Sequence, residues 1–193
     1  MCRVMSLERI RSFISIDVED PELIERIVDV QRRIAATGAG LKLVRPENIH
    51  LTIRFLGEIP RKTIDMVIEI MKGVKFRPFK MRICNLGTFP ERRRPRVIWL
   101  GVGEGAREVT EIYESLEKEL RRIGLPSDKE AFVPHITIAR VKWSSPSLMG
   151  VINELRGVDI GEMMVDRIRL KKSTLTPRGP IYETLFEVKA EVN

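Results

Sequence analysis

Cysteine, histidine and glutamine are scarce in this 193-residue sequence, and long apolar runs are absent. The two cysteines, Cys2 and Cys84, are too few for a disulfide framework, and neither belongs to a Cys-x-x-Cys zinc motif. No apolar run approaches the roughly 20 residues of a membrane span, and the first residues lack the apolar core of a signal peptide. These absences predict a cytoplasmic protein that is not anchored in a membrane.

The composition is that of a globular and basic protein. Hydrophobic residues make up 43% of the chain and charged residues 32%, which permits a substantial core. Lysine and arginine together number 34 against 27 acidic residues, so the net charge is +7. This excess favours phosphate-bearing partners such as nucleic acid, although many basic domains bind nothing anionic.

Strand and helix patterns alternate along the chain without a linker, which indicates one domain over residues 1–193. Asp20 followed by Pro21 predicts the start of the first helix, because these residues suit the N-cap and the first helical position. Helices are predicted from Pro21 to Gly38, over 60–72, from Gly105 to Gly124 and over 145–156. Strands are predicted over 11–18, 41–44, 49–56, 79–86, 96–102, 134–142, 163–171 and 181–189.

A repeated tetrapeptide is the most informative feature of the sequence. The first motif, His50-Leu-Thr-Ile, recurs 85 residues later as the second motif, His135-Ile-Thr-Ile. Each lies in a predicted strand that follows a predicted helix, and together they hold the only two histidines of the chain. We therefore expect two pseudo-symmetric halves, each with one His-x-Thr strand, around a shared cleft.

The alternation of side chains along a strand places the polar residues of each motif on one face. His50, Thr52 and Arg54 are predicted to share a face, and so are His135 and Thr137. The imidazole and the hydroxyl of one motif then lie about 6.5–7 Å apart along the strand.

Two such pairs suit the chemistry of phosphoesters. One imidazole can donate a proton while the other accepts one, and threonine hydroxyls can donate hydrogen bonds to phosphate oxygens. Two alternatives stay open at this point. The histidines could be packing or surface residues, or they could bind a metal, although zinc takes three or four protein ligands and no acidic residue has a suggestive spacing.

Four segments of the chain resemble one known family. They are RSFISIDV near the start, HLTIRFLG at 50–57, RPRVIWLGV at 94–102 and PHITIAR at 134–140. With these segments the chain resembles the 2H phosphoesterases, and among them the bacterial and archaeal RNA 2′,3′-cyclic phosphodiesterases, also called 2′-5′ RNA ligases.

The resemblance implies a fold and a set of roles. The fold would be α+β and bilobal, with two antiparallel sheets around a central cleft and helices on the outside. His50 would be the proton donor and His135 the proton acceptor, while Thr52 and Thr137 would hold the phosphate.

Two arginines are further candidates for substrate binding. Arg140 matches a basic residue that often follows the second motif in the family. Strict alternation turns it away from His135, so a bulge or strand end would have to redirect it. Arg54 is predicted to point with His50 but is less typical of the family at its position.

The resemblance implies that the enzyme hydrolyses a terminal 2′,3′-cyclic phosphate on RNA to a 2′-phosphomonoester. The same geometry run backwards, with a 5′-hydroxyl end in place of water, would form a 2′-5′ bond. We expect no metal and no nucleotide cofactor, and the sequence contains no Gly-x-x-x-x-Gly-Lys-Ser/Thr motif. No obligatory protein partner is inferred. The alternatives are a non-catalytic RNA-binding module and a phosphodiesterase for small cyclic nucleotides.

Two further features have two interpretations each. The basic run of Arg92, Arg93, Arg94 and Arg96 is either a solvated loop or a contact to the RNA backbone. The two tryptophans, Trp99 and Trp143, either stack on bases or pack within the protein.

Overall fold

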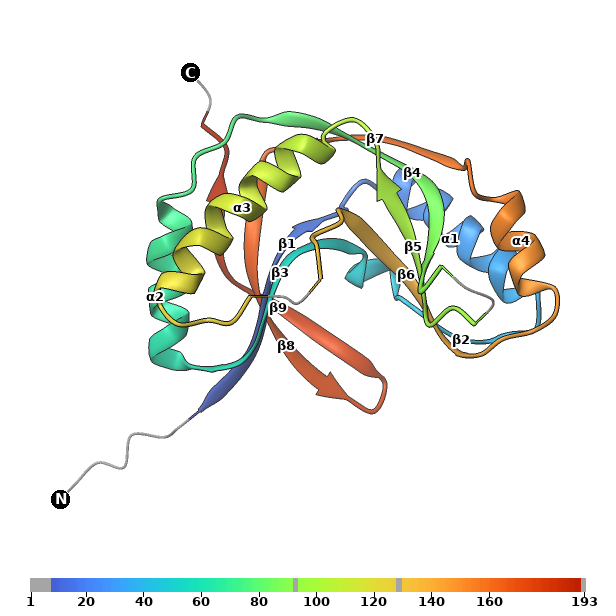
Figure 1. Cartoon of the computed structure of the whole chain (residues 1–193), viewed down its shortest axis with the longest axis horizontal. Coiled ribbons are helices and arrows are strands. Elements are labelled where there is room, and N and C mark those ends of the chain that lie inside the picture. Colours follow the sequence, from blue (N-terminus) through green and yellow to red (C-terminus); the bar gives the residue numbers. More distant parts are fainter. Residues whose placement is uncertain (1–7, 92–93, 128–129, 192–193) are drawn as a thin grey trace.

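The computed structural model describes residues 8–91, 94–127 and 130–191 of the chain. Its elements confirm the predicted alternation of strands and helices (Figure 1). In chain order they are β1 (Arg9–Asp17), α1 (Pro21–Ala35), β2 (Gly40–Leu43), the 3-10 helix η1 (Pro46–Asn48), β3 (His50–Pro60), α2 (Arg61–Lys72), β4 (Phe79–Phe89), β5 (Val97–Val102), α3 (Ala106–Arg122), β6 (His135–Trp143), α4 (Leu148–Glu154), β7 (Asp159–Val165), β8 (Arg167–Thr176) and β9 (Gly179–Lys189).

The strands form two antiparallel halves of one continuous sheet. Their order is β7-β4-β5-β6-β3-β1-β8-β9, and β2 pairs with β6 as well. The halves are joined at β3 and β6 by the single residue pair Leu51 and Ile136. The two sheets expected from the sequence are therefore these two halves, and each half contains one His-x-Thr strand.

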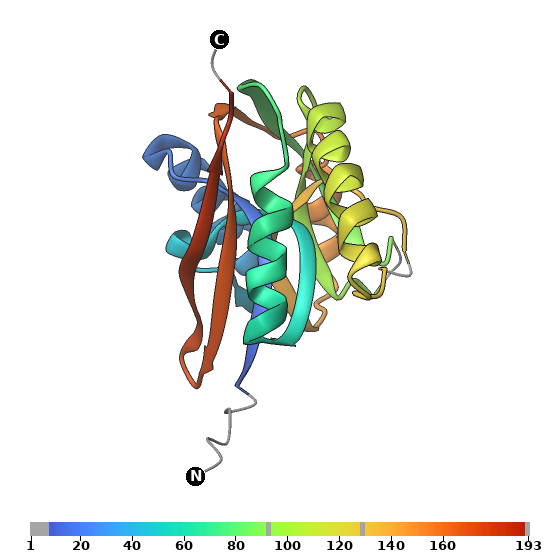
Figure 2. The same ribbon diagram turned by 90° about the vertical axis from the view of Figure 1, so that its left-hand side faces the viewer.

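The helices lie outside the sheet, but each half is covered partly by helices that follow strands of the other. Helices α1 and α4 accompany the half that contains β6, although α1 follows β1 (Figure 1). Helices α2 and α3 accompany the half that contains β3, although α3 follows β5, and they lie side by side in Figure 2. Each half of the sheet is thus built from separated segments of the chain. No helix within the described residues is long and apolar enough to span a membrane.

The apolar stripes seen in the sequence explain how the helices pack. Asp20 caps α1 by accepting hydrogen bonds from the backbone N–H groups of Glu22 (2.8 Å) and Leu23 (3.3 Å), as its position predicted. The stripes then face the sheet because their side chains recur at helical spacing. The buried residues are Leu23, Ile27, Val30, Gln31 and Ile34 in α1, and Val109, Ile112, Leu116 and Leu120 in α3.

One predicted strand is wrong. Residues 163–171 alternate like a single strand, but the chain leaves β7 at Val165 and enters β8 at Arg167. β7 pairs with β4, whereas β8 pairs with β1, so Asp166 is the point at which the chain crosses from one half of the sheet to the other. The alternation runs through the crossing, and therefore the sequence does not reveal it.

Candidate active site

The two motifs meet where the halves of the sheet join. Leu51 pairs with Ile136 in antiparallel fashion. His50 therefore lies across from the strand position of Thr137, and Thr52 lies across from that of His135. The two apolar residues of this pair are fully buried, while the histidines and threonines beside them are half-buried on the opposite face. Four polar side chains from two strands thus gather around a local twofold axis.

Both imidazoles are held in the same way by a carbonyl two residues earlier. Nδ1 of His50 lies 2.7 Å from the Asn48 carbonyl oxygen, and Nδ1 of His135 lies 2.7 Å from that of Val133. A carbonyl oxygen can only accept, so Nδ1 carries the hydrogen in each ring. Nε2 of each histidine is therefore the atom left for chemistry.

The first motif is more tightly held than the second. Nε2 of His50 lies 3.0 Å from the Thr52 hydroxyl, so the two side chains lean toward each other and the predicted separation of about 6.5–7 Å is wrong for this motif. Asn48 is itself buried, and its side-chain amide donates a hydrogen bond of 3.0 Å to the Pro180 carbonyl at the start of β9. This contact ties the acceptor of the His50 ring to the hairpin that carries Tyr182.

Each imidazole packs against a pair of aromatic rings that also contact each other, and these rings partly remove it from water. The centroid distances are 4.9 Å (Phe13) and 5.4 Å (Tyr182) for His50, and 5.1 Å (Phe89) and 6.1 Å (Trp99) for His135. Burial lowers the pKa of both histidines, although the hydrogen bonds to Asn48 and Val133 act in the opposite direction. Both rings are therefore mainly neutral in the free protein at pH 7.

A carboxylate lies beside His50 on the neighbouring strand. Asp17 pairs with His50 in the β1–β3 ladder, and its Oδ2 accepts hydrogen bonds from Lys171 (2.6 Å) and Arg169 (2.8 Å). Burial alone would raise the pKa of Asp17, but these hydrogen bonds outweigh it and the pKa lies below its usual value. The carboxylate thus stays charged, and its charge raises the pKa of His50 against the effect of burial.

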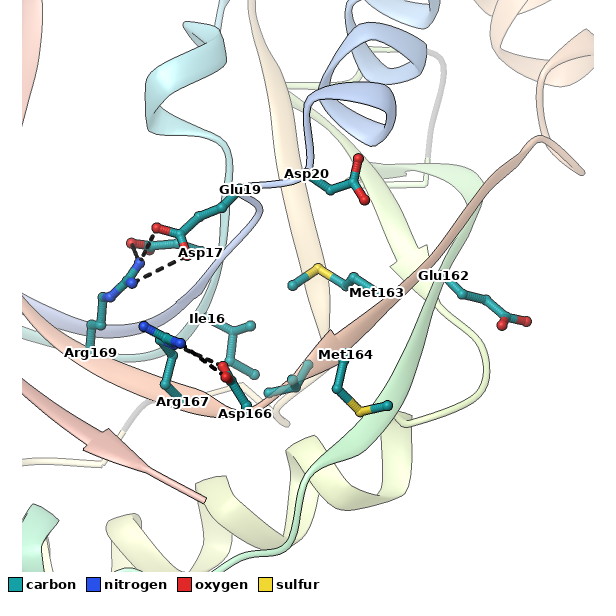
Figure 3. A pocket seen from close by; sticks show the side chains of 11 residues that line it. Ile16, Asp17, Glu19, Asp20, Glu162, Met163, Met164, Asp166, Arg167 and Arg169 are labelled. Atoms are coloured by element: carbon teal, nitrogen blue, oxygen red, sulfur yellow. Dashed lines mark hydrogen bonds and ion pairs between the residues drawn. The ribbon is translucent and has the colours of Figure 1, made fainter. Parts of the chain in front are cut away.

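The ion pairs continue away from the histidine. Arg169 also binds Glu19 and Glu187, each at 2.8 Å, and Figure 3 shows its guanidinium facing the carboxylates of both Glu19 and Asp17. The corresponding neighbour of His135, on β5, is Gly101. Within the described residues, the charged network therefore borders the first motif only.

A bulge in β3 reverses the predicted placement of Arg54. Ser15 pairs with Thr52 but Ile14 pairs with Arg54, so Ile53 is an extra residue in the ladder. The Arg54 side chain is only 3% exposed, and its Nε donates a hydrogen bond of 2.7 Å to Glu117 of α3. The prediction that Arg54 shares the face of His50 is therefore wrong.

A bulge at the same point of the second motif has the opposite consequence for Arg140. Trp99 pairs with Thr137 but Ile98 pairs with Ala139, so Ile138 is the extra residue. Arg140 is exposed and returns to the face of the motif. Its charge acts on Tyr182, whose ring packs on His50. The bulge that the assignment of Arg140 required is thus present.

Several residues of this site were missed by the sequence analysis. Gln31 donates hydrogen bonds of 2.8 Å to the carbonyls of Ile138 and Val44 and so braces the second bulge. The sequence does contain an indication of this role, because Gln31 is the only glutamine of the chain and interrupts the apolar stripe of α1. Phe55, 55% exposed, occupies in β3 the place that Arg140 has in β6. Asp17 and Lys171 come from strands whose pairing the sequence does not specify.

The remaining predicted features are placed as follows. Arg92 and Arg93 lie outside the described residues, whereas Arg94 and Arg96 are exposed. Trp99 packs beside His135, while Trp143 is 60% exposed. Among the residues that the structure describes, no group of three or more His, Cys, Asp or Glu side chains could hold a metal ion.

Comparison with known proteins agrees with the fold and with its repeat. The chain matches the LigT-like phosphoesterase family twice, over residues 16–99 and 100–182. It is 40% identical over 170 residues to the RNA 2′,3′-cyclic phosphodiesterase of Aeropyrum pernix, covering 87% of this chain and 97% of that protein. The protein of the same name from Archaeoglobus fulgidus is 37% identical over 175 residues, with coverages of 91% and 97%. The crystal structure of TT0787 from Thermus thermophilus superposes with a TM-score of 0.81 at 27% identity, over 93% of this chain and 97% of that one.

Proposed function

The chain belongs to the LigT-like phosphoesterase family, and from this premise we propose that it is an RNA 2′,3′-cyclic phosphodiesterase. The enzyme opens the cyclic phosphate at an RNA end and leaves a 2′-phosphomonoester. The observation that carries the proposal is the pair of imidazoles at the junction of the sheet, each with Nδ1 fixed on a carbonyl and Nε2 left for proton transfer.

In the proposed mechanism His135 is the general base. Its ring is mainly neutral before substrate binds, because burial lowers its pKa. Nε2 therefore accepts a proton from water as the water oxygen attacks phosphorus. The Nδ1–H bond to Val133 orients the ring and stabilises the imidazolium that forms.

His50 is the general acid in this mechanism. It must be protonated to donate, and two charges favour that form. One is the Asp17 carboxylate on the neighbouring strand, and the other is the phosphate of the bound substrate. Nε2 of His50 then protonates the departing 3′ oxygen, so one proton enters the enzyme at His135 and one leaves it at His50.

The other polar groups of the face hold the phosphate. Thr52 and Thr137 flank the two imidazoles and donate hydrogen bonds to its non-bridging oxygens. Arg140, brought to this face by the second bulge, supplies the positive charge that the transition state requires. We assign no such role to Arg54. With a 5′-hydroxyl RNA end in place of water, the same groups would form a 2′-5′ bond.

The test is turnover of an oligonucleotide ending in a 2′,3′-cyclic phosphate, in the presence of EDTA. We expect a 2′-phosphomonoester product from the wild-type protein. His50→Ala and His135→Ala should each lower kcat by about 10²–10⁴, the range for a positioned acid or base. A product with the phosphate on the 3′ oxygen, a need for metal, or wild-type rates in a folded histidine variant would refute the proposal. An oligonucleotide that binds but is never hydrolysed would indicate the RNA-binding module instead.

A further inference from the structure

A second polar strip continues from the catalytic face along β6. Beyond the second bulge, Lys42 of the edge strand β2 pairs with Arg140 of β6. Directly paired residues project to the same face of a sheet, and both side chains are exposed. The strip therefore begins at the proposed phosphate-binding arginine and leads away from the histidines.

At the far end of this strip an exposed tryptophan is seated on a glycine. Trp143 pairs with Gly40. A Cβ atom on Gly40 would lie 2.2–2.5 Å from atoms of the indole ring, so the ring covers the side of the backbone from which a side chain would project. Gly40 and Lys42 are alternate residues of β2 and share a face. The indole ring thus lies on the same face as Lys42 and Arg140, and it remains 60% exposed.

We propose that this β2–β6 strip, consisting of Lys42, Arg140 and Trp143, binds the RNA upstream of the cyclic phosphate, with Lys42 at a backbone phosphate and Trp143 stacked on a base. The inference rests on the proposed function and deepens it, because it makes an RNA end the preferred substrate. A mononucleotide bound at the histidines does not reach Trp143. The six steps along the strand from Thr137 to Trp143 span up to about 20 Å at 3.3 Å per residue.

The chemistry of the strip suits single-stranded RNA. Such surfaces combine cationic side chains that follow the phosphates with aromatic rings that accept any base. A groove between α2 and α3 is acidic and so differs in charge from the β2–β6 strip. Lys118 is the only cation among its lining residues, which include Glu69, Glu111, Glu114 and Glu119. RNA phosphates would be repelled there, so charge favours the β2–β6 strip.

The experiment compares two substrates for each variant: 2′,3′-cyclic AMP and an oligonucleotide of several residues that ends in a cyclic phosphate. For Trp143→Ala we expect KM for the oligonucleotide to rise about 5- to 150-fold, the range for loss of one base–aromatic stack. Trp143→Phe should restore most of the affinity, because it retains an aromatic face. Lys42→Ala should flatten the log–log salt dependence of oligonucleotide binding by about 0.7, the value for one phosphate contact on a single strand.

The mononucleotide assay separates failure of this inference from failure of the proposed function. Met66→Ala is the matched control, since Met66 is a 40% exposed apolar side chain on α2, away from the strip. If the cyclic mononucleotide and the oligonucleotide are both left intact by wild-type protein, the proposed function fails. If both are hydrolysed but the oligonucleotide KM of Trp143→Ala equals that of Met66→Ala, the function stands and the β2–β6 strip is not the RNA site.

Discussion

The two motifs are almost identical in sequence but lie in different surroundings. His50 has a charged carboxylate, Asp17, as its cross-strand neighbour, whereas His135 has Gly101. The residue after the bulge is Arg54 in β3 and Ala139 in β6. Arg54 forms an ion pair with Glu117 in the interior. The next position holds Phe55 in the first half and Arg140 in the second.

This comparison shows how one repeated motif can serve two roles. Burial lowers the pKa of His50, but the fixed negative charge of Asp17 opposes this effect and so favours the protonated ring that a proton donor requires. A proton acceptor needs a neutral ring, and His135 lies among Phe89, Trp99 and a glycine. The neighbouring strands, and not the tetrapeptides, distinguish the two halves.

The largest expected effect is a difference between the two histidine variants on substrates with different leaving groups. A ribose 3′ oxygen must be protonated as it leaves, whereas p-nitrophenolate leaves without a proton. With a nucleoside 2′-(p-nitrophenyl phosphate) we expect His50→Ala to regain most of the about 10²–10⁴ that it loses on the cyclic phosphate. His135→Ala should stay impaired on both substrates. Rates of nitrophenolate release, compared with cyclic-phosphate turnover, provide the measurement.

The double variant is the control for this assignment. Because both imidazoles serve one transition state, His50→Ala with His135→Ala should cost less than the two single losses combined. Equal recovery of the two single variants on the activated substrate would mean that the two surroundings do not determine the direction of proton flow.

The next effect concerns the two arginines. Arg54→Ala removes one partner of a buried ion pair, so we expect the free energy of unfolding to fall by about 3–5 kcal/mol. Its kcat/KM per folded molecule should stay at the wild-type value, because the side chain faces α3. Arg140→Ala is the matched variant: its side chain is exposed, so stability should hold while transition-state stabilisation falls by about 1.5–3 kcal/mol. Denaturant titration together with kinetics tests both, and a catalytic defect in folded Arg54→Ala would contradict its placement.

These arginines also show which side-chain orientations the sequence pattern predicts correctly and which it does not. The alternation of apolar and polar residues was sufficient to find both motif strands and the faces of their first three residues. The last residue of each motif, Ile53 or Ile138, is an extra residue in the ladder and reverses the alternation for the residues that follow. Strict periodicity therefore placed Arg54 at the site and Arg140 away from it, and the structure has the reverse. A bulge depends on pairing with another strand, which a local pattern does not contain.

The same limit applies to the groups around His50. Lys171 reaches Asp17 because β8 pairs with β1, although the two residues are separated by most of the chain. The sequence placed Lys171 at the end of a single strand over 163–171, and the crossing at Asp166 was not visible. The Asp20 cap of α1 and the apolar faces of α1 and α3 depend on neighbours within a few residues and were predicted correctly. The predicted bounds of the helix over 145–156 were wrong, because α4 begins only at Leu148 and ends at Glu154.

A smaller effect is expected from the threonines. Thr52→Val and Thr137→Val retain the shape of the side chain and remove the hydroxyl. If both donate to a charged phosphate oxygen, each should lose about 1.5–3 kcal/mol of transition-state stabilisation. Thr52 also contacts Nε2 of His50 in the free protein, so its variant should change the pH profile as well. Unchanged kcat/KM with lowered thermal stability would instead make these hydroxyls structural.

The smallest expected effect tests the charge beside His50. Asp17→Asn removes the carboxylate that raises the pKa of His50 and leaves the Lys171 ammonium, which lowers it. The loss of the carboxylate and the uncompensated charge of Lys171 both move the pKa of His50 further below its ordinary value. Less of the protonated, acid form of His50 therefore exists at high pH. We expect kcat/KM at pH 8 to fall about fivefold, which corresponds to about 1 kcal/mol. The acidic limb of the profile, which reports deprotonation of His135, should stay in place.

Two further variants determine whether this effect is electrostatic. Glu19→Gln removes a partner of the same Arg169, but Glu19 is not among the largest influences on the pKa of His50, so its pH profile should stay close to that of the wild type. Adding Lys171→Met to Asp17→Asn removes the excess positive charge. The basic limb of the pH profile should then move part of the way back toward its wild-type position. If Glu19→Gln shifts the profile as much as Asp17→Asn, the network acts on His50 through packing. The difference between the two motifs would then be one of rigidity and not of charge.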